Sequence, residues 1–438
     1  MICFTPDLCF CLLTQGCKVN QYESQALREA WCAAGMTETD DPAQADMVLI
    51  NSCAVTERAI SDLAKLTRTL AALCPKPRII IAGCAVEADL ERIAALPGVD
   101  EVVRQQDKTT PGLGLASRPV QSGAHFPPLH ITEYHRARAV LKVQDGCSHG
   151  CTYCIIPATR GASVSREPAA VIAEAKRLAE AGIYELSLCG INLRHYGRDL
   201  TPRCDFWDLL AAVDAALAPV CSGQMRLRIS SLEPADLHAK ALDTLAGSRL
   251  VCPHLHLSVQ SGSPEILRRM GRGHYSPEDI SGFVEELRRI WPVFGLGADF
   301  ITGFPGETED HARQTSQVVQ GLPLTYAHIF PYSERPGTAA ARFPRQVPGH
   351  LRRQRAKDLR ALVQDKRQDF LRHLLNLPVM TVIPEQTNQG VNEFYVDCQI
   401  ETTSQLVPGK PVQVRPVAVI QQGLRVAQTD PADQETLS

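Results

Sequence analysis

Short apolar segments alternate with longer amphipathic segments through the middle of the chain. The apolar segments predict strands at residues 139–143, 184–188, 225–229, 254–259, 296–301 and 327–330. The amphipathic segments predict helices at residues 168–181, 206–217, 235–245, 264–270, 277–290 and 308–322. Consecutive strand–helix units predict a parallel sheet with right-handed crossovers, and therefore an incomplete (βα)6 TIM-like barrel.

The N-terminal part repeats this alternation, and the C-terminal part breaks it. Strands are predicted at residues 8–13, 45–50 and 78–82, with helices at residues 21–34, 57–73 and 87–96. These elements predict an N-terminal parallel α/β domain. After residue 378, short alternating segments at residues 379–383, 394–400 and 412–419 predict a small antiparallel β-barrel.

We therefore expect an α/β protein with three domains. Residues 8–107 would form the N-terminal domain, residues 133–375 the barrel and residues 376–432 the β domain. Residues 108–132, which begin with a stretch rich in Thr, Pro, Gly and Ser, would form a linker. A chain of 438 residues with 44% hydrophobic residues can bury several cores.

The net charge of −3 gives no global sign of a nucleic-acid partner, so a basic surface would have to be local. Residues 342–372 carry ten Lys and Arg against three Asp, with apolar residues at helical spacing. A basic helix of this kind can follow RNA phosphates in a salt-dependent way. The same pattern fits a solvated helix packed on the barrel.

The N-terminal residues lack the cationic segment of a secretory signal, and no apolar run reaches the roughly 18 residues of a membrane span. We therefore expect a cytoplasmic protein without a membrane partner, and we expect a monomer. Sixteen cysteines in such a protein indicate reduced thiols and metal ligation rather than disulfides.

Three of these cysteines, Cys147, Cys151 and Cys154, have the spacing of ligands to a [4Fe-4S] cluster with one open iron. Three thiolates can hold only three of the irons, which leaves the fourth for the amine and carboxylate of S-adenosylmethionine (SAM). The alternative is a structural zinc site with His149 as a fourth ligand. Closed zinc sites usually have a second Cys-x-x-Cys, and none follows at a plausible distance.

The predicted barrel strands all end in small or polar turns. The C-terminal rim of a (βα) barrel is where chemistry is placed, so these turns should surround the cluster. They occupy residues 145–147, 189–192, 230–234, 260–262, 303–306 and 331–333.

A second set of cysteines, Cys17, Cys53 and Cys84, follows the three N-terminal strands. The carboxyl ends of parallel strands share one edge of a sheet, so these cysteines can meet at one point. This predicts a second three-thiolate cluster with an open iron, and the alternative is three inert, small apolar side chains. Cys189, on the predicted rim, is left undecided. The remaining cysteines are expected to be core or surface thiols: Cys3, Cys9, Cys11, Cys32, Cys74, Cys204, Cys221, Cys252 and Cys398.

Four segments resemble the radical SAM methylthiotransferase family, and the resemblance runs over about residues 14–372. The segments are residues 16–24, 143–161, 229–234 and 330–338. The resemblance implies an N-terminal α/β domain, a radical SAM partial barrel and a small C-terminal β domain called TRAM. It also implies that the N-terminal cysteine set holds an auxiliary [4Fe-4S] cluster, and that the other set holds the cluster that cleaves SAM.

The sequence motif of residues 16–24 is similar to that of the MtaB type within this family; it reads Gly-Cys-Lys-Val-Asn-Gln-Tyr-Glu-Ser. That type converts N6-threonylcarbamoyladenosine at position 37 of tRNA to its 2-methylthio derivative. The resemblance implies that one SAM methylates a sulfur at the auxiliary cluster, and that a second SAM yields the radical that starts substitution at C2. The implied partners are the tRNA anticodon loop with this base, an electron donor such as flavodoxin or ferredoxin, and a sulfur source. The alternatives are action on isopentenyladenosine-37 or on a ribosomal-protein aspartate, or a non-catalytic iron–sulfur carrier.

The resemblance also places SAM along the barrel rim. Tyr153 matches an aromatic position whose backbone commonly faces the adenine, and Gly190 and Asn192 match the segment that meets the amino and carboxylate end. The further candidates for ribose and adenine contacts are Ser258, Gln260, and the turn with Gly303 and Pro305. Each of these could instead only shape its loop.

Overall fold

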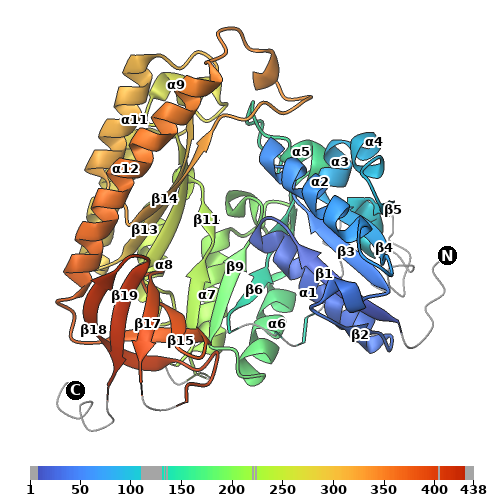
Figure 1. Cartoon of the computed structure of the whole chain (residues 1–438). Coiled ribbons are helices and arrows are strands. Elements are labelled where there is room, and N and C mark those ends of the chain that lie inside the picture. Colours follow the sequence, from blue (N-terminus) through green and yellow to red (C-terminus); the bar gives the residue numbers. More distant parts are fainter. Residues whose placement is uncertain are drawn as a thin grey trace.

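The computed structural model describes residues 8–109, 131–132, 134, 137–219, 221, 224–402 and 405–429. Three parts follow one another along the chain, coloured blue, green to orange, and red in Figure 1. Most of the predicted linker and Cys3 lie outside the described residues. Lys108, which the prediction assigned to the linker, is buried in a 3-10 helix, Gln105–Thr109, at the end of the N-terminal part. The domain boundaries stay predictions.

The N-terminal part is a five-stranded parallel sheet in the order β2-β1-β3-β4-β5. The strands are β1 Cys9–Thr14, β2 Thr37–Glu38, β3 Met47–Ser52, β4 Arg78–Gly83 and β5 Val99–Val103. The helices are α1 Lys18–Ala33, α2 Glu57–Ala71, α3 Cys84–Ala88 and α4 Leu90–Ala94. Central strand β3 is buried on both faces, with Val48 in one core and Leu49 in the other, as expected of a parallel sheet covered by helices.

One N-terminal prediction was wrong. The single helix predicted at residues 87–96 is two short helices, because Asp89 leaves helical geometry at φ −162°. The Asp89 carboxylate instead caps α4 by accepting the Arg92 N–H at 3.1 Å. The edge strands β2 and β5 were not predicted. Strand β2 has only two residues, which is too short to show an apolar pattern.

The middle part confirms the predicted partial barrel, whose strands are parallel to their sheet neighbours. Two short strands outside the barrel sheets, β7 Gln144–Asp145 and β8 Val164–Ser165, pair antiparallel. The sheets are β6-β9-β10 and β11-β12-β13-β14, divided at Ser230 between β10 and β11. The strand order follows the sequence, as in a (βα) barrel that does not close. The strands are β6 Ala139–Lys142, β9 Glu185–Cys189, β10 Arg226–Ile229, β11 Ser231–Leu232, β12 His254–Gln260, β13 Gly295–Thr302 and β14 Tyr326–Pro331.

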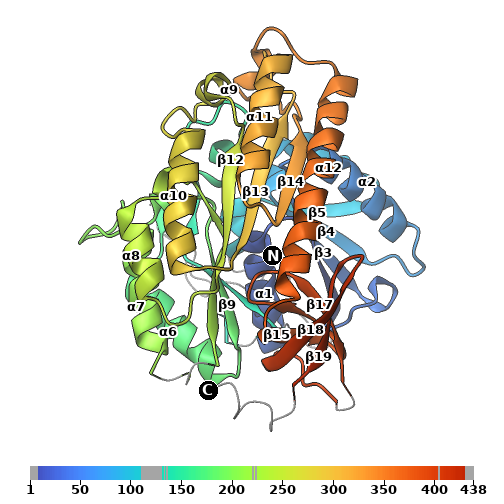
Figure 2. The ribbon, with the colours of Figure 1, turned by 90° about the vertical axis from the view of Figure 1, so that its left-hand side faces the viewer.

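Helices cover the outside of these sheets, and Figure 2 shows α11 and α12 running along β13 and β14. The helices are α6 Pro168–Glu180, α7 Phe206–Leu217, α8 Ala239–Gly247, α9 Pro264–Arg269, α10 Pro277–Ile290, α11 Glu309–Gly321 and α12 Gly349–Leu374. The helix predicted from residue 235 begins only at Ala239, because Pro234–Asp236 forms a 3-10 turn. In the described residues, every helix is too short or too polar to cross a lipid bilayer.

The C-terminal part is a closed barrel in the order β15-β16-β17-β19-β18. Its strands are β15 Met380–Gln386, β16 Gln389–Asn392, β17 Asp397–Glu401, β18 Val412–Ile420 and β19 Gly423–Gln428. The barrel is antiparallel as predicted, except that β17 and β19 pair in parallel. Arg226 and Arg228 dock it to the amino-terminal ends of the middle strands, because they donate to the Val391 and Asn392 carbonyl oxygens at 2.7 and 3.1 Å.

The N-terminal part contacts the open barrel at two places, edge strand β6 and the loop after edge strand β14 (Figure 1). Helix α1 packs on β6 at one edge. At the other edge, in the loop after β14, Arg335 pairs with Glu57 of α2 at 3.1 Å and the Ser333 hydroxyl accepts the Glu57 N–H at 3.4 Å. The carboxyl edge of the N-terminal sheet therefore faces the barrel rim.

The basic run at residues 342–372 forms most of α12, which packs on β14 and α11. Several of its cations bind the protein itself. Arg352 donates to the Tyr332 carbonyl oxygen at 2.9 Å, and Arg355 pairs with Glu307 at 2.8 Å. Leu351, expected on the apolar face, is 39% exposed. The packed-helix alternative is thus correct for much of the run, and RNA contact by its exposed cations stays a prediction.

Candidate active site

Two of the three N-terminal cysteines follow a glycine whose backbone other residues rarely adopt. Gly16 and Gly83 have φ of +112° and +102°. A Cβ on Gly83 would lie 2.3 Å from the Ser52 carbonyl oxygen, and one on Gly16 would lie 2.7 Å from the Cys53 Cβ. These close contacts hold the ends of β1, β3 and β4 together.

The thiols of Cys17, Cys53 and Cys84 meet at this edge, which we call the auxiliary site. Burial, together with the nearby Cys17 and Cys84, raises the pKa of the Cys53 thiol to about 11. Cys17 is exposed and Cys84 is buried, so the site runs from the surface into the protein. The structure thus brings together three cysteines that the sequence places at separate strand ends.

Replacing Gly83 by alanine is expected to disrupt the auxiliary site, because the new Cβ would overlap the Ser52 backbone. The strained backbone alone costs about 1–3 kcal/mol of unfolding free energy. Thermal unfolding and the iron content of anaerobically reconstituted protein measure the two effects. Gly182→Ala is the matched control, since Gly182 also has a positive φ of +84° but open space around its Cβ. Equal iron content in the two variants would contradict this packing argument.

A cation from the barrel reaches into the auxiliary site. Helix α5, Ile156–Arg160, follows the Cys154 loop, and Arg160 at its end donates its Nε–H to Cys84 Sγ at 3.1 Å. The same guanidinium donates to Asn20 Oδ1 and to Glu23 Oε1, each at 2.7 Å. Its side chain is only 1% exposed. Arg160 therefore connects the two cysteine sets through protein atoms.

Arg160 belongs to a buried charge network. Glu23 also pairs with Lys108 at 2.9 Å and with Lys142 at 3.0 Å. Asp145 pairs with Lys142 at 2.6 Å and with Arg160 at 3.0 Å. Burial alone would raise the pKa of Glu23, but Arg160 and the two lysines hold it well below its usual range. Three cations face two carboxylates, so the network keeps a net positive charge, which favours thiolates in the adjoining site.

The second set, Cys147, Cys151 and Cys154, lies between β7, Gln144–Asp145, and α5, and we call it the loop site. Side-chain N–H groups point at its sulfurs: Asn192 Nδ2 lies 3.8 Å from Cys147 Sγ, and Arg272 Nη1 lies 3.6 Å from Cys151 Sγ. Burial raises the pKa of the Cys154 thiol to about 12. Donors aimed at sulfur suit thiolates bound to iron, so both sites fit a three-cysteine cluster.

The ring of His149 is engaged beside the loop site. His149 Nε2 lies 3.0 Å from the Gly271 carbonyl oxygen, and the ring centroid lies 4.8 Å from that of His274. The contact with Gly271 engages only Nε2 and does not involve Nδ1, so the ring of His149 does not decide between a cluster and a zinc site. The side-chain donors aimed at the sulfurs favour the cluster over the zinc alternative.

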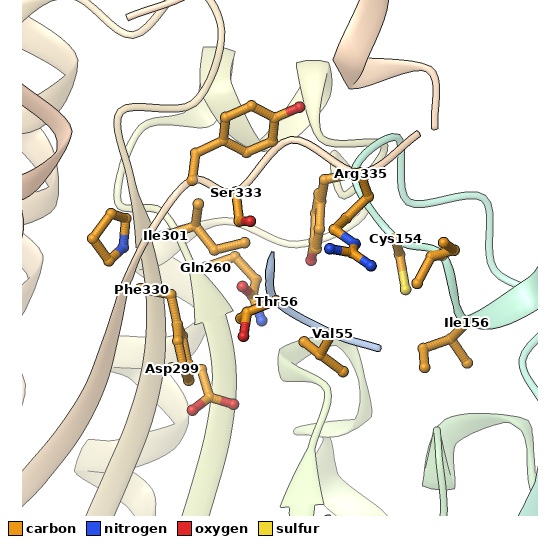
Figure 3. Close-up of a pocket in the computed structure, with 14 residues that line it drawn as sticks. Val55, Thr56, Cys154, Ile156, Gln260, Asp299, Ile301, Phe330, Ser333 and Arg335 are labelled. Carbon is orange, nitrogen blue, oxygen red and sulfur yellow. The ribbon is translucent and has the colours of Figure 1, made fainter. Parts of the chain in front are cut away.

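A cavity of about 260 Å³ opens where the N-terminal part meets the barrel rim (Figure 3). Val55 lines it from the segment after Cys53, and Cys154 and Ile156 line it from the loop site. Figure 3 shows the side chains of Cys154 and Ile156 on one side of the cavity and those of Phe330 and Asp299 of the barrel on the other. The mostly apolar lining suits a flat ring with a few polar contacts.

Two of the predicted SAM-contact residues, Tyr153 and Gln260, line this cavity. Asn192 lies beside Cys147 and donates to Glu233 Oε2 at 3.0 Å. Gly190 instead makes room for a neighbouring side chain, because a Cβ there would lie 2.9 Å from the Gln144 Cβ.

Gly303, Pro305 and Ser258 contact other protein groups. A Cβ on Gly303 would lie 2.4 Å from Arg352 Cγ of α12, and the Pro305 carbonyl oxygen accepts from Arg269 Nε at 3.1 Å. The Ser258 carbonyl oxygen accepts from Arg272 Nη2 at 3.0 Å, so Ser258 contacts the residue that faces Cys151. The loop-shaping alternative fits Gly303 and Pro305 best.

The sequence analysis did not predict a role for three charged residues of the site: Arg160, Glu233 and Arg272. Arg160 and Glu233 lie within the motif segments, where a charge beside a ligand loop or at a strand end could have marked them. Arg272 gave no such signal, because 121 residues separate it from Cys151.

Comparison with known proteins agrees with this geometry. The "Radical SAM superfamily" model matches residues 141–319, and the "Uncharacterized protein family UPF0004" model matches residues 10–104. Among solved structures, the radical S-adenosylmethionine methyltransferase TsrM from Kitasatospora setae, with cobalamin and a [4Fe-4S] cluster bound, shares the fold. Its TM-score is 0.56 at 15% identity, over 76% of this chain and 77% of that chain.

Curated relatives cover most of the chain. The threonylcarbamoyladenosine tRNA methylthiotransferase MtaB of Bacillus subtilis is 33% identical over 87% of this chain and 85% of that protein. A tRNA-2-methylthio-N(6)-dimethylallyladenosine synthase of Cereibacter sphaeroides is 36% identical over 81% of this chain and 82% of that protein. The two facing cysteine sites, the partial barrel and these relatives together show that the chain belongs to the radical SAM methylthiotransferase family.

Proposed function

We propose that the enzyme transfers a methylthio group to C2 of N6-threonylcarbamoyladenosine at position 37 of tRNA. The observation that carries the proposal is the link between the two three-cysteine sites: Arg160, which follows the loop site, donates to Cys84 of the auxiliary site, and the cavity lined by Cys154 lies beside the segment after Cys53. The choice of substrate is supported by relatives named as threonylcarbamoyladenosine tRNA methylthiotransferases, each at least 32% identical to this chain.

Both cysteine sets would hold a [4Fe-4S] cluster, and the loop site would also bind SAM. When bound, these groups supply one-electron cleavage of SAM and a sulfur that can be methylated and transferred. Radical chemistry is required because the C2–H bond of adenine is neither acidic nor electrophilic, so a base or nucleophile cannot replace the hydrogen. The proposed partners are tRNA, an electron donor such as flavodoxin or ferredoxin, and a sulfur source.

The residues of the chain would position these reactants. Asn192 and Arg272 orient the loop-site sulfurs, and Arg160 holds Cys84 in the auxiliary site. Tyr153 and Phe330 line the cavity and would contact the flat rings of SAM and of the base. Position 37 lies in an anticodon loop, where a base can leave the stack and enter such a cavity.

Mass spectrometry of tRNA nucleosides from cells with and without this protein tests the proposal. The expected result is loss of the 2-methylthio mark from threonylcarbamoyladenosine, while the unmodified precursor accumulates. Loss from the isopentenyl nucleoside instead would overturn the choice of substrate. Unchanged tRNA nucleosides together with loss of a methylthio group from a ribosomal protein would show that the substrate is a protein. If the reduced protein formed no 5′-deoxyadenosine from SAM, it would be an iron–sulfur carrier and not an enzyme.

A further inference from the structure

Lys18 places a cation directly beside the auxiliary site. It follows Cys17, opens α1, and donates from Nζ to the Ser187 hydroxyl of β9 at 3.3 Å. The ring centroid of Tyr395 lies 5.9 Å from the same nitrogen. Within the described part of the chain, no carboxylate oxygen lies within 4.0 Å of this ammonium. A half-buried cation without a carboxylate favours binding of an anion.

A cavity of about 180 Å³ adjoins Lys18. Arg138 and Arg228 also line it, and both are already paired. Arg228 donates to Glu185 at 2.8 Å, and Arg138 donates to Glu385 at 2.7 Å. Of these three lining cations, Lys18 alone has no carboxylate partner in the described residues, so the cavity offers space and charge for one further carboxylate.

The substrate proposed above supplies such a carboxylate. C2 and C6 of adenine flank N1, so the N6 substituent of a base whose C2 faces the auxiliary site begins close to that site, and Lys18 is the residue that follows Cys17 there. The threonylcarbamoyl substituent ends in a carboxylate, whereas an isopentenyl substituent is a hydrocarbon that cannot pair with an ammonium group.

The geometry points to Lys18 as a specificity-determining residue: its ammonium group, beside the Ser187 hydroxyl, receives the carboxylate of the N6 substituent. This inference rests on the proposed function and adds the group that selects the substrate. The Tyr395 ring also lies 5.8 Å from the Arg138 guanidinium and 5.0 Å from that of Arg228, so it holds the cations around the cavity.

Lys18→Gln tests the inference through RNA binding. The probes are anticodon stem-loop RNAs with threonylcarbamoyladenosine, isopentenyladenosine or adenosine at position 37, titrated against iron-loaded protein by fluorescence anisotropy. Loss of a charge-assisted hydrogen bond is expected to weaken binding of the threonylcarbamoyl RNA by roughly 10- to 100-fold. Binding of the other two RNAs should not change. Lys18→Arg should restore most of the preference, and Lys65→Gln, 69% exposed on α2, is the control.

Ser187→Asp is an independent variant that leaves α1 intact. The new carboxylate on β9 would form an ion pair with the Lys18 ammonium group. This variant should therefore also lose the preference for the threonylcarbamoyl RNA. Because Lys18 adjoins Cys17, the iron content of every variant is measured, and Ser187→Asp decides the matter if Lys18→Gln loses iron.

Two results would overturn the inference. If Lys18→Gln weakened binding of all three RNAs equally, Lys18 would contact the phosphate backbone and not the N6 substituent. If Lys18→Gln and Ser187→Asp both kept the wild-type preference for the threonylcarbamoyl RNA, Lys18 would have no part in selecting the substrate. A wild-type protein that prefers and modifies the isopentenyl RNA would instead refute the proposed function. A wild-type protein that modifies the threonylcarbamoyl RNA, with unaffected variants, would refute only the role of Lys18.

Discussion

Replacing Cys17, Cys53 and Cys84 together by alanine is expected to lower the iron content from about eight to about four atoms per chain, since each [4Fe-4S] cluster rests on its own cysteine set. The loop site remains intact in this variant, so reduction in the presence of SAM should still release 5′-deoxyadenosine. Methylthio transfer should fall below detection. Iron analysis and mass spectrometry of the products from anaerobically reconstituted protein measure all three quantities.

The matched control replaces Cys9, Cys32 and Cys74, three cysteines of the same domain outside the auxiliary site. It should keep about eight irons and full activity. The complementary variant without Cys147, Cys151 and Cys154 should keep about four irons and lose 5′-deoxyadenosine formation. An auxiliary-site variant that retains the wild-type iron content, or a wild type with only about four irons, would refute the two-cluster arrangement.

The strands and the rim could be predicted because local patterns carry them. β3 and β4 contain apolar runs that are buried on both faces, and each strand ends in a small residue, Ser52 or Gly83, that is followed directly by a cysteine. Since parallel strands align their carboxyl ends, the approach of Cys53 to Cys84 follows from those patterns alone. The barrel strands were predicted from the same pattern, an apolar run followed by a small or polar turn.

The contacts around the thiols could not be predicted because their partners are distant in sequence. Arg160 meets Glu23 across 137 residues and Cys84 across 76 residues. Lys18 meets Ser187 across 169 residues. A pattern in one segment shows that a charge is present, but only the packing of two domains decides which groups it meets. The backbone break at Asp89 was missed for a similar reason, because the cap depends on a single side chain within an otherwise helical pattern.

Removing the Arg160 guanidinium is expected to weaken both the fold and the auxiliary site. Without it, Glu23 and Asp145 stay buried with two lysines, and Cys84 loses its N–H donor. Breaking a buried ion pair by removing one partner typically costs about 3–5 kcal/mol of unfolding free energy. The reduction potential of the auxiliary cluster should also fall, because a hydrogen bond to sulfur and a nearby positive charge both stabilise the reduced state. Thermal unfolding and a redox titration followed by electron paramagnetic resonance measure the two effects in Arg160→Gln.

Arg166→Gln separates stability from the effect on the cluster. Arg166 is similarly buried, and it donates to Glu174 at 2.7 Å and to the Tyr22 hydroxyl at 3.3 Å. Its loss should lower stability to a similar degree and leave the potential unchanged. Arg160→Lys keeps the charge without the Nε–H that reaches Cys84, so it should retain more stability than Arg160→Gln while its potential still falls. If Arg160→Gln and Arg166→Gln shift the potential equally, the contact between Arg160 and Cys84 serves only the fold.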